Sequence, residues 1–269
     1  TLVAPVHVSG HIFSILSFIA ALYYVLLYVE RGQVSSVVIA GLFCGFSLLN
    51  KPIHYGGASV IGGVVTIVLN DFFFNTNKLK SSFLFLLAAA LLPILAYGAV
   101  LTVVPFQSLF YNVFPMYSGY FNKASSFFYF KEMLPLKIFA AQSLAELKSA
   151  INSFLGDSVR WWMIWAMALG GIVKVVLLYS SEKKVSKTQI VLFSLAMHSI
   201  LMEFQVLVVP HQFASYVNMF PTYVLLCYFV STTSARWLKV CGIAFVGGWF
   251  GLFFVYSAVN HYVYFKKNG

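Results

Sequence analysis

Long apolar runs are the feature that most constrains this chain. A bilayer core about 30 Å thick requires roughly 20 mostly apolar residues in each helix that crosses it. About eight segments meet that requirement: residues 11–29, 35–50, 53–70, 82–104, 161–179, 188–209, 212–231 and 240–258. Strands of a membrane barrel would alternate polar and apolar residues, and these runs do not. The sequence therefore predicts an all-α, polytopic transmembrane helix bundle that forms one domain over residues 1–269.

The charged residues agree with a membrane protein. Only 9% of residues are charged, against about 25% in ordinary soluble domains, so a soluble globular fold is excluded. The net charge of +10 would suggest nucleic acid in a soluble protein. Here the positive charges lie in short breaks between apolar runs, so we expect membrane lipids as partners and no nucleic acid.

The short breaks also predict an orientation, because Lys and Arg collect in cytoplasmic loops. If the first span enters the cytoplasm at its C-terminal end, the cytoplasmic breaks hold Arg31, Lys78, Lys80, Lys183, Lys184, Lys187, Arg236 and Lys239. The opposite short breaks hold only Lys51. Adding the long segment and the C-terminal tail makes the two sides equal, so the short breaks decide. We expect a multi-pass protein of the cell (inner) membrane or, in a eukaryote, of the endoplasmic reticulum.

One long excursion, residues 105–160, falls on the outer face. Its first part, residues 106–130, holds eleven Phe or Tyr, which favour the headgroup level. Farther on, apolar residues recur at helical spacing, at Leu136, Ala140, Leu144, Leu147, Ile151 and Leu155. This pattern predicts an amphipathic helix that lies in the plane of the membrane.

Two breaks on the outer face carry candidate anion-binding residues. Asn50-Lys51-Pro52, with His54, ends the second span, and proline stops the helix there. Lys51 and His54 would then face an outward cavity, where a cation can bind a phosphate. The alternative is that Lys51 extends to the lipid headgroups. The other break contains His211.

His211 lies in the break Pro210-His211-Gln212, between the sixth and seventh spans, and Tyr216 follows it. His211 could donate a hydrogen bond to phosphate or carry a proton. An ordinary turn at the membrane interface explains the same residues equally simply. We therefore treat His211 and Tyr216, like Lys51 and His54 in the first break, as candidate substrate-binding positions.

Three carboxylates are weak catalytic candidates. Glu203 lies within the sixth span. An ionisable residue there costs free energy to insert into the membrane, so it is a candidate for a functional role. It follows His198 by five residues, which is not the spacing of direct neighbours on a helix. Glu132 in the aromatic segment is more simply a solvated contact of Lys131. Asp157 pairs at i, i+3 with Arg160 and more simply flanks the fifth span.

Metal-binding signals are weak. His7 and His11 are one helical turn apart, but a third ligand is missing nearby, so we assign no metal site and leave a divalent ion as an option. The cysteines Cys44, Cys227 and Cys241 each lie inside an apolar run, which indicates neither a disulfide framework nor a zinc site.

The segment Ala40-Gly41-Leu42-Phe43-Cys44-Gly45-Phe46-Ser47-Leu48-Leu49-Asn50-Lys51-Pro52 resembles the GT-C class of polyprenyl-phosphate-sugar-dependent glycosyltransferases, such as protein mannosyltransferases and aminoarabinose transferases. In that class a glycine-spaced helix ends in a Thr-Lys-Pro or similar triplet. The Tyr23-Tyr24 and Glu30-Arg31-Gly32 exit of the first span and the Pro210-His211 break ahead of Asn218-Met219-Phe220-Pro221 also agree with it.

The resemblance implies transfer of a sugar from a polyprenyl-phosphate donor to a glycan, lipid or protein acceptor at the periplasmic or lumenal face. Lys51 and His211 would hold the donor phosphate, with His54, Tyr216 and His11 near it. The class usually carries its acidic catalytic residue in the first outer loop, and often an acid where His11 stands. Because the chain begins at Thr1 without methionine, we expect a piece of a longer protein whose general base lies upstream.

Two alternatives remain open. A polymerase or ligase of lipid-linked glycans would also use a large outer loop, but it predicts several arginines there, and residues 105–160 hold only Arg160. A transporter or flippase for a lipid-linked or anionic substrate predicts inverted repeats and broken helices that meet at the midplane. The sequence shows no internal repeat, and its charges gather at one membrane surface, an asymmetry that favours the enzyme.

Overall fold

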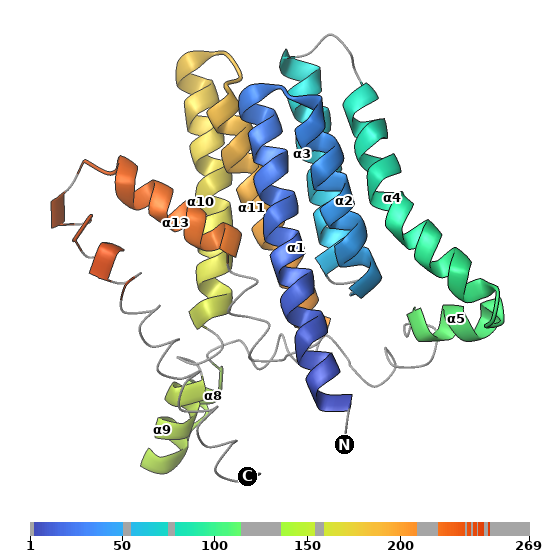
Figure 1. The fold of residues 1–269 in the computed structure, drawn as a ribbon. Coiled ribbons are helices and arrows are strands. Elements are labelled where there is room, and N and C mark those ends of the chain that lie inside the picture. The colour runs from blue at the N-terminus through green and yellow to red at the C-terminus, as the bar shows by residue number, and fades with distance from the viewer. Residues whose placement is uncertain are drawn as a thin grey trace.

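The computed structural model describes residues 3–50, 55–74, 79–113, 136–153, 159–208 and 220–234, and short pieces between 236 and 247. Every regular element in these ranges is a helix (Figure 1). The elements are α1 (Val3–Arg31), α2 (Val34–Asn50), α3 (Gly57–Phe74), α4 (Lys80–Leu101), α5 (Phe106–Val113), α8 (Leu136–Phe139), α9 (Leu144–Ser153), α10 (Val159–Glu182), α11 (Lys187–Val208) and α13 (Phe220–Thr232). The predicted all-α class is confirmed.

Four described helices carry segments that are long and apolar enough to cross a membrane: Phe13–Arg31, Gly57–Phe74, Lys80–Leu101 and Trp162–Glu182. Three shorter apolar helices are Val34–Asn50, Lys187–Met202 and Phe220–Thr232. The first six predicted spans correspond to α1, α2, α3, α4, α10 and α11. The seventh is described only from Phe220, and most of the eighth, residues 240–258, lies outside the described residues.

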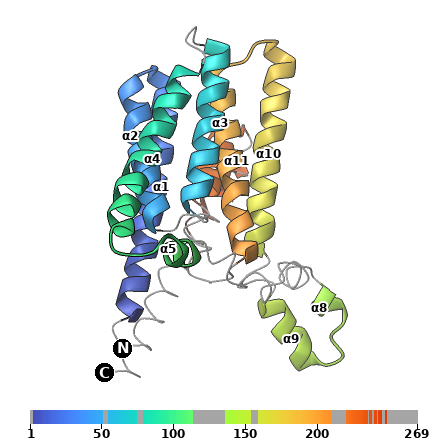
Figure 2. The same cartoon turned by 90° about the vertical axis from the view of Figure 1, so that its right-hand side faces the viewer.

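The long helices alternate in direction, so their ends fall at two levels (Figures 1 and 2). The inner end, named for the predicted orientation, holds the breaks after α1, after α3 and after α10. Gly32 ends α1 with φ 71°, and its N–H bonds to the Tyr28 carbonyl at 2.8 Å. A left-handed glycine directly after the last turn satisfies a carbonyl and stops the helix. The outer end holds the start of α1, the end of α2 and the end of α11.

Close contact between α2 and α4 depends on two glycines. A Cβ on Gly41 would lie 2.6 Å from the Phe85 carbonyl oxygen, and one on Gly45 would lie 2.6 Å from the Ala89 carbonyl oxygen. Only glycine fits such a backbone approach, and small residues at helix interfaces let the backbones of membrane helices come close together. The contact forms one side of a core that also contains Val25, Tyr28, Val37, Ala40, Cys44, Ile67, Phe85 and Ala89.

Pro93 divides α4 into a packed and an unpacked half. The buried residues of α4 are Ser81, Ser82, Phe85, Ala88 and Ala89, all before the proline. Pro93 has no N–H to bond the Ala89 carbonyl, and that carbonyl is the one Gly45 approaches. After Pro93 the helix leans away from α2, and α5 turns off its end (Figure 1).

A second core joins α1 to α10, α11 and α13. It contains Phe18, Leu22, Leu192, Leu195, Ala196 and Leu225 among its buried residues. Figure 2 shows α10 and α11 side by side along their length. The two cores share α1 and α3, since Ala58 of α3 lies in the second core and Ile67 of α3 in the first, and these two helices connect the α2–α4 side with the α10–α13 side of the bundle.

The excursion between α4 and α10 differs from the expectation in one respect. The apolar spacing predicts one helix from Leu136 to Leu155, but α8 ends at Phe139 and α9 begins at Leu144. Ser143 explains the break, because its hydroxyl accepts the Glu146 N–H at 3.2 Å while the Glu146 carboxylate accepts the Gln142 N–H at 2.9 Å. This arrangement resembles a capping box, except that the carboxylate accepts from the residue before the N-cap, and it starts a new helix.

Both short helices lie beyond the ends of the long helices, on the outer side (Figures 1 and 2). Phe139 and Leu144 are 82% and 86% exposed, so apolar side chains point outward from this region. The aromatic residues from Phe114 to Phe130 lie outside the described residues. An in-plane position on the membrane stays a prediction.

The glycine contact gives a first test. Gly41→Ala should destabilise the bundle by about 1–3 kcal/mol, because the new methyl group meets backbone rather than a movable side chain. Gly98→Ala is the matched control, since a Cβ there meets nothing within 4 Å and alanine favours helix. Thermal unfolding in detergent measures both. Equal melting temperatures for Gly41→Ala and the unchanged protein would contradict the packing described for α2 and α4.

Candidate functional site

Most of the predicted donor-binding residues belong to breaks between helices, and the structure describes the flanking helices but not the breaks. Lys51 and His54 fall between Asn50 and Tyr55, outside the described residues. Four more candidates fall in other parts of the chain outside the described residues: His211, Tyr216, Glu132 and Asp157. His11 lies in α1 and Glu203 in α11, but their side chains are outside the described part. The geometry of the candidate site therefore comes from the helices that flank these residues.

The flanking helices meet at the outer end. There α1 begins, α2 ends at Asn50, α3 begins at Gly57 and α11 ends at Val208 (Figures 1 and 2). The same four helices contact one another: α1 packs on α2, α3 and α11, and α3 packs on α2 and α11. The ends of α2 and α11 and the start of α3, which are far apart in sequence, therefore lie toward the outer end of the bundle, and α1 begins on the same side.

The connection from α2 to α3 is short and well anchored. Gly56 lies so close to α2 that a Cβ would be 2.7 Å from the Leu48 Cα. Tyr55 is fully buried, and the Ser59 hydroxyl donates to its carbonyl at 2.6 Å. The chain thus lies beside α2 again at Tyr55 and Gly56. Lys51 and His54 belong to this short connection by their place in the sequence.

His198 is buried at mid-helix in α11, with 1% of its surface exposed. Its Nδ1 lies 2.8 Å from the Ser194 carbonyl oxygen, which can only accept, so Nδ1 carries the proton in that bond. The ring is 5.9 Å from the Phe18 ring, and a Cβ on Gly62 would lie 2.3 Å from Nε2. Gly62 therefore makes the space for the imidazole against α3. The sequence supports a link to Glu203 only weakly, and the described contacts of His198 go to Ser194 on its own helix, to Phe18 on α1 and to Gly62 on α3.

Hydroxyl groups extend this buried polar region across three helices. The Thr66 and Ser194 hydroxyl oxygens are 2.8 Å apart and join α3 to α11. The Thr222 hydroxyl donates to the Ser199 hydroxyl at 3.1 Å and joins α13 to α11. Interhelical hydrogen bonds of this kind contribute about 0.6 kcal/mol each in membrane bundles. They position α11 relative to α3 and α13.

Asp71 is a buried carboxylate that the sequence analysis missed. It lies in the last turns of α3 with 1% of its surface exposed, and the Tyr28 hydroxyl donates to its Oδ1 at 2.5 Å. The Tyr28 hydroxyl is also 2.8 Å from the Ser81 hydroxyl. Three helices, α1, α3 and α4, meet here at the inner end. The missed signal is the Asn70-Asp71 pair at the close of an apolar run, just beyond the predicted boundary at residue 70.

The described part of the chain offers few candidate metal ligands or reactive thiols. Among the described side chains, no three His, Cys, Asp or Glu residues gather to hold a metal ion. The side chains of His7 and His11 lie outside that set. Cys44 is buried and Cys227 is exposed, and both are free thiols.

Comparison with known proteins finds no match for this chain among protein-family models, curated proteins or solved structures. The class that fold and site define is therefore a coarse one. In the part of the chain that the structure describes, every regular element is a helix, four helices are suited to crossing a membrane, and the ends of several helices lie on one side.

The Asp71 contact gives a second test. Tyr28→Phe removes a hydrogen bond to a buried carboxylate and should destabilise the protein by about 1–3 kcal/mol. Tyr23→Phe is the control, because Tyr23 is 58% exposed on the same helix. Thermal unfolding again reports the difference. If both variants melted together, the Tyr28 hydroxyl would contribute nothing to stability.

The convergence of helix ends gives a third test by labelling. In a background with the three native cysteines replaced by alanine, Asn50→Cys and Gln212→Cys should react with a membrane-impermeant maleimide from one side. Gln33→Cys, in the break after α1, should react only from the other side. Reaction of Asn50→Cys and Gln212→Cys from opposite sides would remove the common site.

Proposed function

We propose that this protein is an integral membrane glycosyltransferase of about eight spans, which moves a sugar from a polyprenyl-phosphate donor to an acceptor at the periplasmic or lumenal face. The site lies at the outer end of the bundle. The observation that carries the proposal is the convergence there of the start of α1, the end of α2, the start of α3 and the end of α11. These are the elements that lead into the predicted phosphate-binding residues.

The proposed transfer reaction needs residues that bind the donor phosphate and a carboxylate that accepts a proton. The Lys51 ammonium and His211 bind the donor phosphate, with His54, Tyr216 and His11 beside it. The bond from the sugar anomeric carbon to the phosphate oxygen breaks, and the phosphate leaves with the electron pair. The acceptor oxygen bonds to the anomeric carbon, and its proton passes to a carboxylate within hydrogen-bond reach. Glu132, Asp157 and Glu203 are the carboxylates of this chain considered for that step.

The lean of α4 supports access for a lipid donor. Beyond Pro93 none of the α4 residues is buried, and Ile94 and Leu95 are 65% and 61% exposed. The outer half of α4 therefore does not close against α2, whose end leads into Lys51 (Figure 1). An isoprenoid chain in the membrane can approach the outer end from that side without crossing a packed helix pair.

Mutation of the phosphate-binding residues tests the proposal. Lys51→Ala and His211→Ala, made in the full-length protein, should each reduce sugar transfer from the lipid donor by about 10-fold or more, since a lost charge-assisted hydrogen bond corresponds to about 1.5–3 kcal/mol. Lys183→Ala, an exposed cation at the inner end, is the control and should leave transfer unchanged. Unaltered transfer in both site variants, with normal melting, would overturn the assignment.

A second candidate is a proton-coupled transporter or flippase for an anionic lipid. The burial of Asp71 and His198 favours it, because ionisable side chains inside membrane bundles often carry protons. Assays on one preparation of the purified protein distinguish the two functions. A transferase forms product from the lipid donor in detergent, whereas a transporter forms none and moves lipid across a sealed vesicle only while Asp71 is present.

A further inference from the structure

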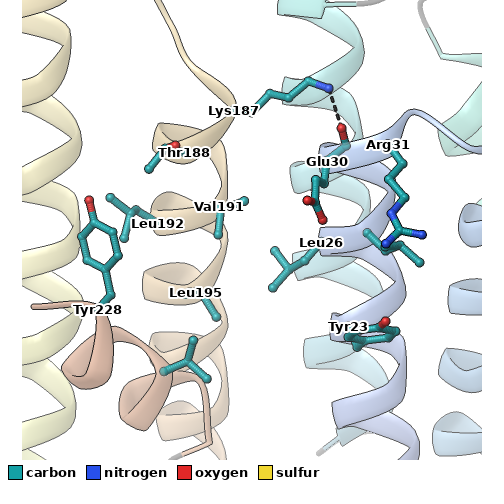
Figure 3. A pocket seen from close by; sticks show the side chains of 12 residues that line it. Tyr23, Leu26, Glu30, Arg31, Lys187, Thr188, Val191, Leu192, Leu195 and Tyr228 are labelled. Atoms are coloured by element: carbon teal, nitrogen blue, oxygen red, sulfur yellow. Dashed lines mark hydrogen bonds between the residues drawn. The ribbon is translucent and has the colours of Figure 1, made fainter. Parts of the chain in front are cut away.

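A cavity of about 440 Å³ opens at the inner end, away from the proposed transfer site. It lies between α1, α11 and α13 (Figure 3). Its deeper walls are apolar and include Leu26, Leu192, Leu195 and Val224. Its rim is polar and is formed by Glu30, Arg31, Lys187, Thr188 and Tyr228. The cavity is thus polar at its opening and apolar farther in.

The rim carries both signs of charge, from Glu30 and Arg31 on α1 and from Lys187 on α11. Lys187, the first residue of α11, reaches across to α1, and its Nζ donates to the Glu30 carbonyl oxygen at 2.7 Å. An ammonium group has three N–H donors, so two remain for a ligand. The Glu30 carboxylate extends into the space between α1 and α11 (Figure 3). No ion pair of this carboxylate is found among the residues the structure describes.

The level of the rim in the membrane follows from the helices. Glu30 and Arg31 are in the last turn of α1, which ends the apolar segment Phe13–Arg31. Lys187 and Thr188 begin α11, which continues as an apolar helix to Met202. Charged residues at the ends of apolar spans lie at the headgroup level. The apolar walls below the rim therefore face the depth of the acyl chains.

We propose that this cavity binds the headgroup of a zwitterionic phospholipid that carries a primary ammonium, as in phosphatidylethanolamine. The lipid phosphate accepts from the two remaining Lys187 N–H groups, and the lipid ammonium donates to the Glu30 carboxylate. The first carbons of an acyl chain lie against Leu26, Leu195 and Val224. The inference rests on membrane location and this cavity, and does not depend on the transfer reaction.

Charge complementarity selects this occupant over other lipids. An anionic lipid without an amine would bring its phosphate beside Lys187 and Arg31 but would leave the Glu30 carboxylate with no cationic group of the lipid, so it gains less than a headgroup that carries both charges. A choline headgroup carries positive charge but has no N–H to donate, so the Glu30 carboxylate would lose its hydrogen bond. A free phosphoethanolamine molecule would match the rim but leave the apolar walls uncovered.

The test measures lipid binding to the purified full chain in detergent by native mass spectrometry. Phosphatidylethanolamine, phosphatidylcholine and phosphatidylglycerol with identical acyl chains are titrated separately, and free phosphoethanolamine is a fourth arm. We expect phosphatidylethanolamine to bind about tenfold more tightly than the other two lipids, or ~1.4 kcal/mol. Free phosphoethanolamine should bind more weakly than the intact lipid.

Variants then connect the preference to the rim. Glu30→Gln should remove the tenfold preference, while Lys187→Met should weaken all three phospholipids. Glu182→Gln and Lys184→Met are the matched controls, because both residues are exposed at the same end and neither lines the cavity. Melting in lipid-free detergent checks that the variants are folded.

Three results would overturn the proposal. They are equal binding of the three lipids, an unchanged preference in folded Glu30→Gln, and an equal loss of preference in Glu182→Gln. The first result would leave a cavity without headgroup selection. The last would assign the preference to the general charge of the inner end.

Discussion

The backbone approach of α2 to α4 at Gly41 and Gly45 is the constraint on which the rest of this bundle depends. With no side chain at either position, carbonyl groups of α4 pack directly on α2. This approach fixes the direction of α2 and therefore the level at which Asn50 ends it. The connection through Tyr55 and Gly56 then sets the start of α3, which positions Thr66 against Ser194 and Gly62 against His198. Close packing on one side of the bundle thus positions the polar groups on the other.

Much of the fold could be predicted from the sequence, because the length of apolar runs depends directly on membrane thickness. The ends of α1, α2 and α11 fall close to the predicted boundaries, and Gly32 and Asn50 mark two of them. The excursion was harder to predict. Its apolar spacing continues through Ala140, but spacing alone does not register the cap at Ser143, whose side chain competes for backbone groups and starts α9 separately.

The site was predictable only in outline. Alternating helix directions carry Asn50 and the end of α11 to one side, and that much follows from counting spans. The burial of Asp71 could not be read in the same way, because a carboxylate at the close of an apolar run is equally compatible with the membrane surface. Its burial depends on Tyr28 of α1 and Ser81 of α4 meeting it, and these tertiary contacts leave no periodic signal. The cavity behind Lys187 is likewise formed by three helices distant in sequence.

Pro93 gives α4 two mechanical parts. The first part is clamped to α2 up to Ala89, while the second part has no buried side chain and carries α5 at its end. A proline inside a helix removes one hydrogen bond and leaves a preferred bending point there. The glycine contact with α2 therefore does not depend on the direction of α4 beyond Pro93, and a different angle at the proline would leave that contact in place.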